Sequence, residues 1–255
     1  MFELRKLLMG DAPASVLKAM HASGELSAVF PELAALDIKD KDSHRHKNNF
    51  FHSLIVLEQA MDFEEKPDIV LRTAALLHDI GKPATRVIEA SGEATFQRHE
   101  MVGARMAKKI LKAHGGYSSE EIAEIYELIA NHMRSYGFSE DLWTDSAVRR
   151  FASDISTEQQ LLRLFSIFKA DLSTKHASKR AKIYTKIDKL AGRVAVVREN
   201  DKLRARRPAL NGHDVMELFG LTAGPELGKM MKFLNTEEGL ALSRDEAIAE
   251  LKKRS

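Results

Sequence analysis

The chain has 255 residues, of which 44% are hydrophobic and 30% are charged, and its net charge is +2. These values are typical of a globular protein with one large domain, or with one domain and a smaller appended one. Because the chain has no cysteine, disulfides and cysteine-based zinc sites are excluded, and any metal must be bound by His, Asp or Glu. Residues 1–6 carry charges and lack an apolar signal core, and no stretch reaches the ~18 apolar residues of a membrane span. We therefore expect a cytoplasmic protein with no membrane partner.

Apolar residues recur with a helical period along most of the chain, which predicts an all-α fold. The first expected elements are short helices around Leu4–Leu8 and Val16–Met20, the second ending at Gly24, then a polar, loop-like segment over 31–48. The next are helices over 50–61 and 67–79, a small loop or hairpin over 86–97, and helices over 99–113 and 118–132. The last are helices over 145–153 and 158–174, a basic amphipathic helix over 178–203, and two or three short helices after Pro208.

Six residues with metal-binding side chains fall at the ends or starts of these predicted helices. They are His52, His78, Asp79, His99, His132 and Asp171. Helix termini can converge in a bundle, and facing helices commonly build metal sites. Four imidazoles and two carboxylates exceed the needs of one ion, so a bridging Asp79 could hold two ions ~3.5–4 Å apart. We expect one or two divalent ions, namely Mn, Fe, Ni, Co, Zn or Mg, with transition ions favoured by the imidazoles.

The string Leu76-Leu77-His78-Asp79-Ile80-Gly81-Lys82-Pro83 distinguishes this set from scattered histidines. An apolar helix ends there in an imidazole and a carboxylate, and Lys82 follows one turn later, where a substrate phosphate would bind. The arrangement favours hydrolysis of a phosphate ester by a metal-activated water, with Asp79 and Lys82 as the catalytic residues. Arg134 and Lys175 are further candidates for phosphate binding.

A structural explanation competes with each of these assignments. A histidine on a helix is more often structural than a metal ligand, and Lys82 could simply be solvated beyond a helix end. A second pair, His213-Asp214, shows how little the His-Asp dipeptide means alone. Asn211-Gly212 before it and an apolar run after it indicate a turn and a helix N-cap.

The ordered set His, His-Asp, His, His, Asp resembles the HD superfamily of metal-dependent phosphohydrolases. Further strings resemble the HD region of bacterial CCA-adding tRNA nucleotidyltransferases, and they are Leu76–Arg86, Phe96–Ala104, Ala147–Phe151 and Pro208–Met216. Phe30-Pro31-Glu32-Leu33 resembles the segment that precedes that region. The resemblance spans residues 3–250 and implies an HD-domain helical bundle with a smaller helical C-terminal extension.

The resemblance also implies ligands, domains and an activity. His52, His78, Asp79 and Asp171 correspond to the core metal ligands, and His99 and His132 to the extra ligands of two-metal members. The implied domains are a neck-like helical segment (1–48), an HD metal-binding core (49–175), and a basic helix with a helical tail (176–255). No segment matches the nucleotidyltransferase head of the CCA-adding enzymes, so we do not expect CCA addition by this chain alone. The expected activity is that of a phosphatase, 2′-nucleotidase or 2′,3′-cyclic phosphodiesterase.

The segment from Lys175 to Arg207 is strongly basic, with twelve Lys or Arg and three acidic residues. A solvated charged face is the usual explanation. The one-sided bias, and the tRNA-facing position of this region in the CCA-adding relatives, favour contact with tRNA or another RNA backbone. The candidate nucleic-acid-binding residues are Lys179, Arg180, Lys182, Lys186, Arg204, Arg206 and Arg207. Aromatic residues are sparse there, so base stacking is not indicated.

Two functions of different classes follow from the sequence. The first is a metal-dependent phosphohydrolase that acts on a phosphate ester of a nucleotide or RNA end. The alternative is a non-catalytic tRNA- or RNA-binding module, or the detached half of a split CCA-adding enzyme. The sequence retains all six candidate ligands, which favours the enzyme, and it identifies no protein partner.

Overall fold

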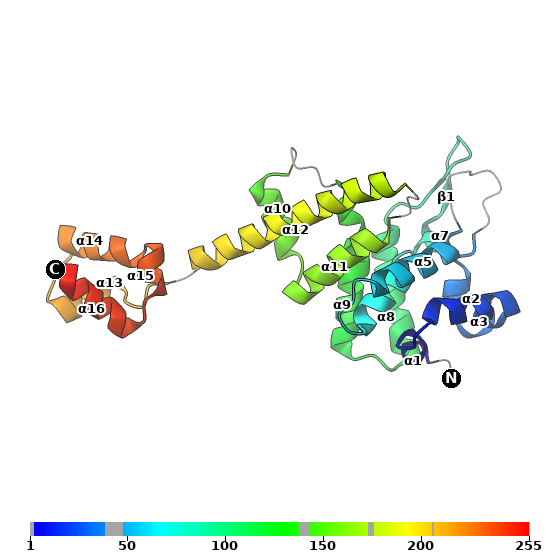
Figure 1. Ribbon diagram of the computed structural model, residues 1–255, viewed down its shortest axis with the longest axis horizontal. Coiled ribbons are helices and arrows are strands. Elements are labelled where there is room, and N and C mark those ends of the chain that lie inside the picture. The colour runs from blue at the N-terminus through cyan, green and yellow to red at the C-terminus, as the bar shows by residue number, and fades with distance from the viewer. Residues whose placement is uncertain (1–2, 39–47, 138–142, 173–175, 206, 255) are drawn as a thin grey trace. The chain divides into compact units, whose positions relative to one another are not determined.

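The computed structural model describes residues 3–38, 48–137, 143–172, 176–205 and 207–254 (Figure 1). These residues are mostly helical, and their β-structure consists of one short two-stranded hairpin. The all-α prediction is therefore confirmed. The chain divides into two compact units, residues 1–194 and 195–255. Within the described ranges, no helix is both long and apolar enough to cross a membrane. The three-part division of the chain at residues 48 and 175 stays a prediction.

The first unit contains a helical bundle and the hairpin. Its elements up to the hairpin are α1 (Leu4–Leu8), α2 (Pro13–Ser23), α3 (Glu25–Val29), α4 (Pro31–Ala34), α5 (Asn49–Met61), α6 (Ile69–Leu77), α7 (Lys82–Thr85), β1 (Val87–Ile88) and β2 (Ala94–Thr95). The following elements are α8 (His99–His114), α9 (Ser119–Asn131), the 3₁₀ helix η1 (His132–Gly137), α10 (Asp145–Ser153) and α11 (Glu158–Ala170). The long helix α12 (Ala177–Ala205) crosses the limit between the two units.

Helix α6 lies at the centre of the first unit. All nine of its residues are buried, because it is apolar nearly all round and packs against α1, α5, α9 and α11. Asp68 caps its N-terminus by accepting the N–H groups of Val70 and Leu71. The one charged residue of α6, Arg72, is satisfied by Glu64 at 2.8 Å and by the carbonyl of Leu8 at 2.7 Å. The helix therefore delivers the His78-Asp79 pair that follows it into the protein interior.

Helix α9 begins with a capping box. The hydroxyl of Ser118 accepts the N–H of Glu121 at 3.0 Å, and the Glu121 carboxylate accepts the N–H of Ser118 at 2.8 Å. The same carboxylate pairs with Arg5 at 2.9 Å. The cap thus fixes the start of the helix that ends at His132.

Replacing Ser118 by alanine should destabilise the first unit by about 1 kcal/mol, because one backbone N–H loses its acceptor. Urea unfolding followed by circular dichroism measures this, and the metal content of the folded protein should not change. Ser119→Ala is the matched control, since Ser119 is the first residue of α9 and makes no cap bond. Equal midpoints for the two variants would contradict the prediction.

Three sequence-based limits were wrong, and proline explains two of them. Residues 31–34 form helix α4 instead of a loop, because Pro31 occupies the first turn and Leu33 is buried. The helix expected over 67–79 ends at Leu77 as α6, and Lys82 and Pro83 then begin a further short helix, α7, which was not expected. Helix α11 ends at Ala170 instead of about 174. The rest of the predicted loop, residues 39–47, lies outside the described part of the chain.

The second unit has its own apolar core. Two or three short helices were expected after Pro208, and the described residues there form four. They are α13 (Gly212–Phe219), α14 (Pro225–Leu234), α15 (Glu237–Ala241) and α16 (Arg244–Arg254). They enclose the buried side chains of Leu210, Val215, Met230, Leu234, Ala247 and Leu251. Asn211 and Asp214 form a capping box at the start of α13, and His213 is 83% exposed. The structural explanation of this second His-Asp pair is therefore confirmed, with Asn211 rather than Asp214 at the N-cap.

Candidate metal centre

The six candidate ligands converge in the interior of the first unit from five helices. His78, His132 and Asp171 are the C-terminal cap residues of α6, α9 and α11, respectively. His52 comes from α5, and His99 is the first residue of α8. The C-terminal end of a helix carries partial negative charge, so three such ends meeting at one place favour a bound cation.

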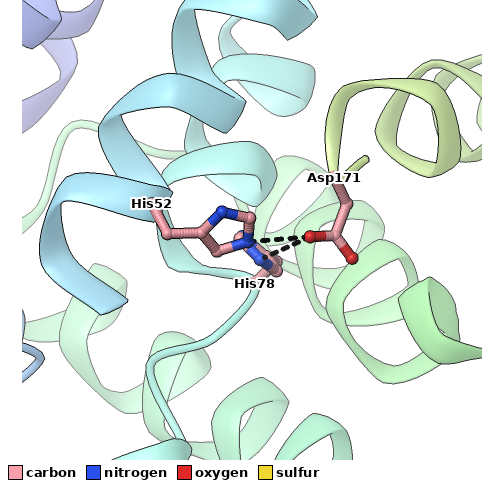
Figure 2. Close-up of side chains that lie close together, drawn as sticks. All are labelled: His52, His78 and Asp171. Atoms are coloured by element: carbon pink, nitrogen blue, oxygen red, sulfur yellow. Dashed lines mark hydrogen bonds and ion pairs between the residues drawn. The ribbon is translucent and has the colours of Figure 1, made fainter. Parts of the chain in front are cut away.

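One cluster consists of His52, His78 and Asp171, whose side chains point toward one another (Figure 2). An oxygen of Asp171 lies 2.8 Å from Nε2 of His52 and 3.5 Å from Nε2 of His78. Asp171 and His78 are buried, and the His52 side chain is 11% exposed. The ligand atoms lie within 4.8 Å of one another, as the donors around one ion would.

A second cluster consists of Asp79, His99 and His132, all buried. Oδ1 of Asp79 lies 3.3 Å from Nε2 of His99 and 3.9 Å from Nε2 of His132. Its other oxygen, Oδ2, lies 3.2 Å from Nε2 of His78 in the first cluster. The two oxygens of Asp79 therefore face different clusters, which is the geometry of a carboxylate that bridges two ions.

Three of the histidines are oriented by the same backbone contact. Nδ1 of His78, His99 and His132 lies 2.8, 2.8 and 2.7 Å from the carbonyl oxygen of the residue three positions earlier. Once its Nε2 proton is lost, an imidazole that donates from Nδ1 presents a lone pair at Nε2. All three Nε2 atoms are buried and lack a hydrogen-bond partner. Buried polar atoms are seldom left without partners, so the donor set fits one or two divalent ions.

The electrostatics of the centre also favour a cation. Burial raises the pKa of the Asp79 carboxyl, but the His78 imidazole outweighs burial and holds the pKa well below its usual range. Burial also raises the pKa of the Asp171 carboxyl, but the hydrogen bond from His52 and the charge of His78 outweigh burial and lower it. Burial lowers the pKa of His78, yet the two carboxylates raise it to about 10. Burial and the His78 charge lower the pKa of His132 to about 4, so this imidazole is neutral.

Two glycines, Gly81 and Gly103, allow the backbone that follows the His78-Asp79 pair to lie against α8. A Cβ atom on Gly81 would lie 2.2 Å from the carbonyl oxygen of His99 and 2.6 Å from the backbone nitrogen of Gly103. Gly81 itself has φ −81° and ψ −14°, which any residue adopts. The absence of a side chain, and not an unusual backbone, is therefore what this contact requires. The expectations drawn from the sequence gave Gly81 and Gly103 no such role.

Of the three candidate phosphate-binding residues, the structure describes Lys82 and Arg134. Nζ of Lys82 lies 2.6 Å from Oδ2 of Asp79 and the side chain is 20% exposed, so it reaches the centre from the solvent side. Arg134 instead pairs with Asp154 at 3.0 Å and stacks on the ring of Phe151. It therefore contributes to neither cluster. Lys175 lies outside the described residues.

The candidate nucleic-acid-binding residues lie on or after α12. Lys179, Lys182 and Lys186 are exposed and share one face of the helix by their spacing, and Arg180 is partly buried. Arg207 is exposed beyond the helix. The side chain of Arg204 and the whole of Arg206 lie outside the described residues.

Comparison with known proteins identifies the family. A model of the HD domain matches residues 49–193, more than half of the chain. The chain is 28% identical over 237 residues to the A-adding tRNA nucleotidyltransferase of Deinococcus radiodurans, covering 91% of this chain and 52% of that protein. It is 30% identical over 261 residues to the CC-adding tRNA nucleotidyltransferase of Thermus thermophilus, covering 97% and 54%. The chain thus spans about half the length of these relatives. The predicted resemblance is confirmed, and the chain belongs to the HD domain family.

Proposed function

We propose that this protein is a metal-dependent phosphohydrolase that cleaves a phosphate ester of a nucleotide or of an RNA end. The observation that carries the proposal is the position of Asp79 between two buried clusters. Each cluster has one carboxylate and two imidazoles, and three of the four imidazole Nε2 atoms have no partner. A structural role alone gives no reason to bury so many unsatisfied donor atoms in one place.

The proposed roles follow from the geometry. His52, His78 and Asp171 would hold one divalent ion, His99 and His132 a second, and Asp79 would contact both. When bound, such ions acidify water and neutralise charge on a phosphoryl group. Lys82 is partly exposed beside Asp79, so its ammonium is placed to contact a phosphate oxygen and to stabilise charge that develops there. We therefore propose Asp79 and Lys82 as the catalytic residues.

The substrate class rests on the relatives, whose names describe addition of nucleotides to tRNA. Those activities belong to proteins about twice as long as the matched region. We carry over only the substrate chemistry, a nucleotide or an RNA end. Hydrolysis of a terminal monoester and hydrolysis of a 2′,3′-cyclic diester are the two reactions that this centre suits.

Removal and replacement of the metal tests the proposal directly. The purified chain should contain about one or two transition ions, measured by plasma emission. It should hydrolyse bis-p-nitrophenyl phosphate and at least one member of a panel of 2′-, 3′- and 2′,3′-cyclic nucleotides. Chelation should abolish hydrolysis, and Mn, Ni, Co or Mg should restore it to different extents. A chain that binds no ion and turns over nothing with any of these ions would contradict the proposal.

RNA binding is a second candidate function, favoured by the extent of the similarity. The match to the Thermus thermophilus protein covers 97% of this chain and so includes the second unit. Lys179, Lys182 and Lys186 offer one basic face on α12, which suits a phosphate backbone. We propose that this face binds tRNA or a related RNA, whether or not the metal centre is active.

A further inference from the structure

Arg98 has the one left-handed non-glycine backbone among the described residues. Its φ is 60° and its ψ is 24°, and it immediately precedes the candidate ligand His99. A long side chain in this region is uncommon, because its Cβ crowds the following carbonyl, whereas glycine and asparagine adopt the region readily. Strained residues that persist cluster at functional sites.

The backbone of Arg98 has a clear structural purpose. Its carbonyl accepts the N–H groups of Met101 at 3.2 Å and Val102 at 3.1 Å, which begins α8. The left-handed turn also brings Nδ1 of His99 to 2.8 Å from the carbonyl of Phe96, which leaves Nε2 directed at Asp79. Glycine would serve this turn with less strain, so the backbone does not explain the arginine.

The side chain of Arg98 has no structural partner within the described ranges. It is exposed, it gives no capping hydrogen bond to α8, and it forms no ion pair. Of the other candidate phosphate-binding cations that the structure describes, Lys82 contacts Asp79 and Arg134 contacts Asp154. The exposed guanidinium of Arg98, the residue before the candidate ligand His99, is therefore available to a group that comes from solution.

We infer that Arg98 binds a phosphate group of the substrate at the metal centre. Guanidinium presents parallel N–H groups that match two phosphate oxygens, which an ammonium cannot do. The inference rests on the proposed phosphohydrolase function and adds a binding residue that the sequence did not reveal. Because Arg98 acts on binding, its loss should raise KM for the substrate far more than it lowers kcat.

Three substitutions separate the charge of Arg98 from its backbone strain. Arg98→Gly removes both, Arg98→Asn removes the charge in a residue that tolerates the turn, and Arg98→Lys keeps a charge with the strain. Arg105→Ala is the matched control. Arg105 is also an exposed arginine, and it lies within α8, seven positions after Arg98.

The readouts are KM and kcat for bis-p-nitrophenyl phosphate, affinity for inorganic phosphate in the Mn-loaded protein by calorimetry, metal content and melting temperature. Arg98→Gly and Arg98→Asn should raise KM and weaken phosphate binding at least about tenfold, with metal content unchanged. The melting temperature of Arg98→Gly should equal or exceed that of the wild type. Arg98→Lys should lose less phosphate affinity than the two uncharged variants, and Arg105→Ala should match the wild type in KM and phosphate affinity.

Two results would overturn the inference. The first is a KM and a phosphate affinity within about twofold of the wild type in both uncharged variants. The second is loss of metal in those variants, which would show that Arg98 positions His99 instead. A wild type that binds phosphate through Arg98 but hydrolyses nothing would contradict the proposed function alone. A wild type that neither binds inorganic phosphate nor hydrolyses bis-p-nitrophenyl phosphate would contradict both.

Discussion

Replacing Asp79 by alanine should remove the bound metal and lower hydrolysis by about a thousandfold or more. Asp79 is the one candidate ligand whose two oxygens face both clusters, at 3.3 Å from His99 and 3.2 Å from His78. On the proposed function, its loss would remove a ligand from each ion and an anionic charge that offsets their positive charge. Metal-ion catalysis contributes several kcal/mol, and each 1.36 kcal/mol is a factor of ten in rate. Metal content and kcat/KM for bis-p-nitrophenyl phosphate measure the effect.

The second His-Asp pair provides a control of the same chemistry. The Asp214 carboxylate accepts the N–H of Asn211 in the capping box of α13 and contacts Arg244 at 3.2 Å, far in sequence from any candidate ligand. Asp214→Ala should lower the stability of the second unit slightly, because the N–H of Asn211 loses its acceptor, and it should leave metal content and turnover unchanged. If Asp79→Ala retained wild-type turnover, the phosphohydrolase mechanism proposed for this centre would be wrong.

The same variant separates the two candidate functions. An RNA-binding module that uses α12 does not need the metal, so Asp79→Ala should keep its affinity for tRNA in a filter-binding assay. Replacement of Lys179, Lys182 and Lys186 by glutamine should weaken that affinity and reduce its dependence on salt. Hydrolysis lost in the first variant with RNA binding retained would show that the two functions are independent.

The sequence predicted which elements would meet, because helix ends and apolar periods are local properties. His78, His132 and Asp171 each follow an apolar helical run, and each is indeed a C-terminal cap. The predicted helix limits were wrong at two prolines. Pro31 and Pro83 lie in the first turn of a helix, and proline begins helices as readily as it ends them. A single sequence does not distinguish these two positions.

The fine geometry of the centre could not be predicted, because it depends on contacts between distant backbones. Periodicity places Asp79 near histidines but does not say that Oδ1 faces His99 while Oδ2 faces His78. It also does not show that Arg134 would pair with Asp154. The left-handed turn at Arg98 has no signal at all, since arginine there is the unusual choice.

Replacing Gly81 by alanine should weaken metal binding at the second cluster, which contains His99, and leave metal binding at the first cluster unchanged. The new Cβ would lie 2.2 Å from the carbonyl oxygen of His99 and 2.6 Å from the nitrogen of Gly103, both backbone atoms that cannot rotate away. Helix α8 must therefore move, and His99 moves with it. His52, His78 and Asp171 come from α5 and from the ends of α6 and α11, so their cluster does not depend on α8.

Overpacking of this kind costs about 1–3 kcal/mol of stability, but the informative quantity is the stoichiometry of metal binding. Titration of the metal-free protein with Mn should show two binding steps in the wild type, and Gly81→Ala should weaken one of them at least about tenfold. Gly103→Ala should have a smaller effect, because its Cβ would lie 3.1 Å from the nitrogen of Gly81. Gly192→Ala in α12 meets nothing within 4 Å and should stabilise the helix by up to about 1 kcal/mol. Two unchanged binding steps in a folded Gly81→Ala variant would show that the approach of α7 to α8 does not position His99.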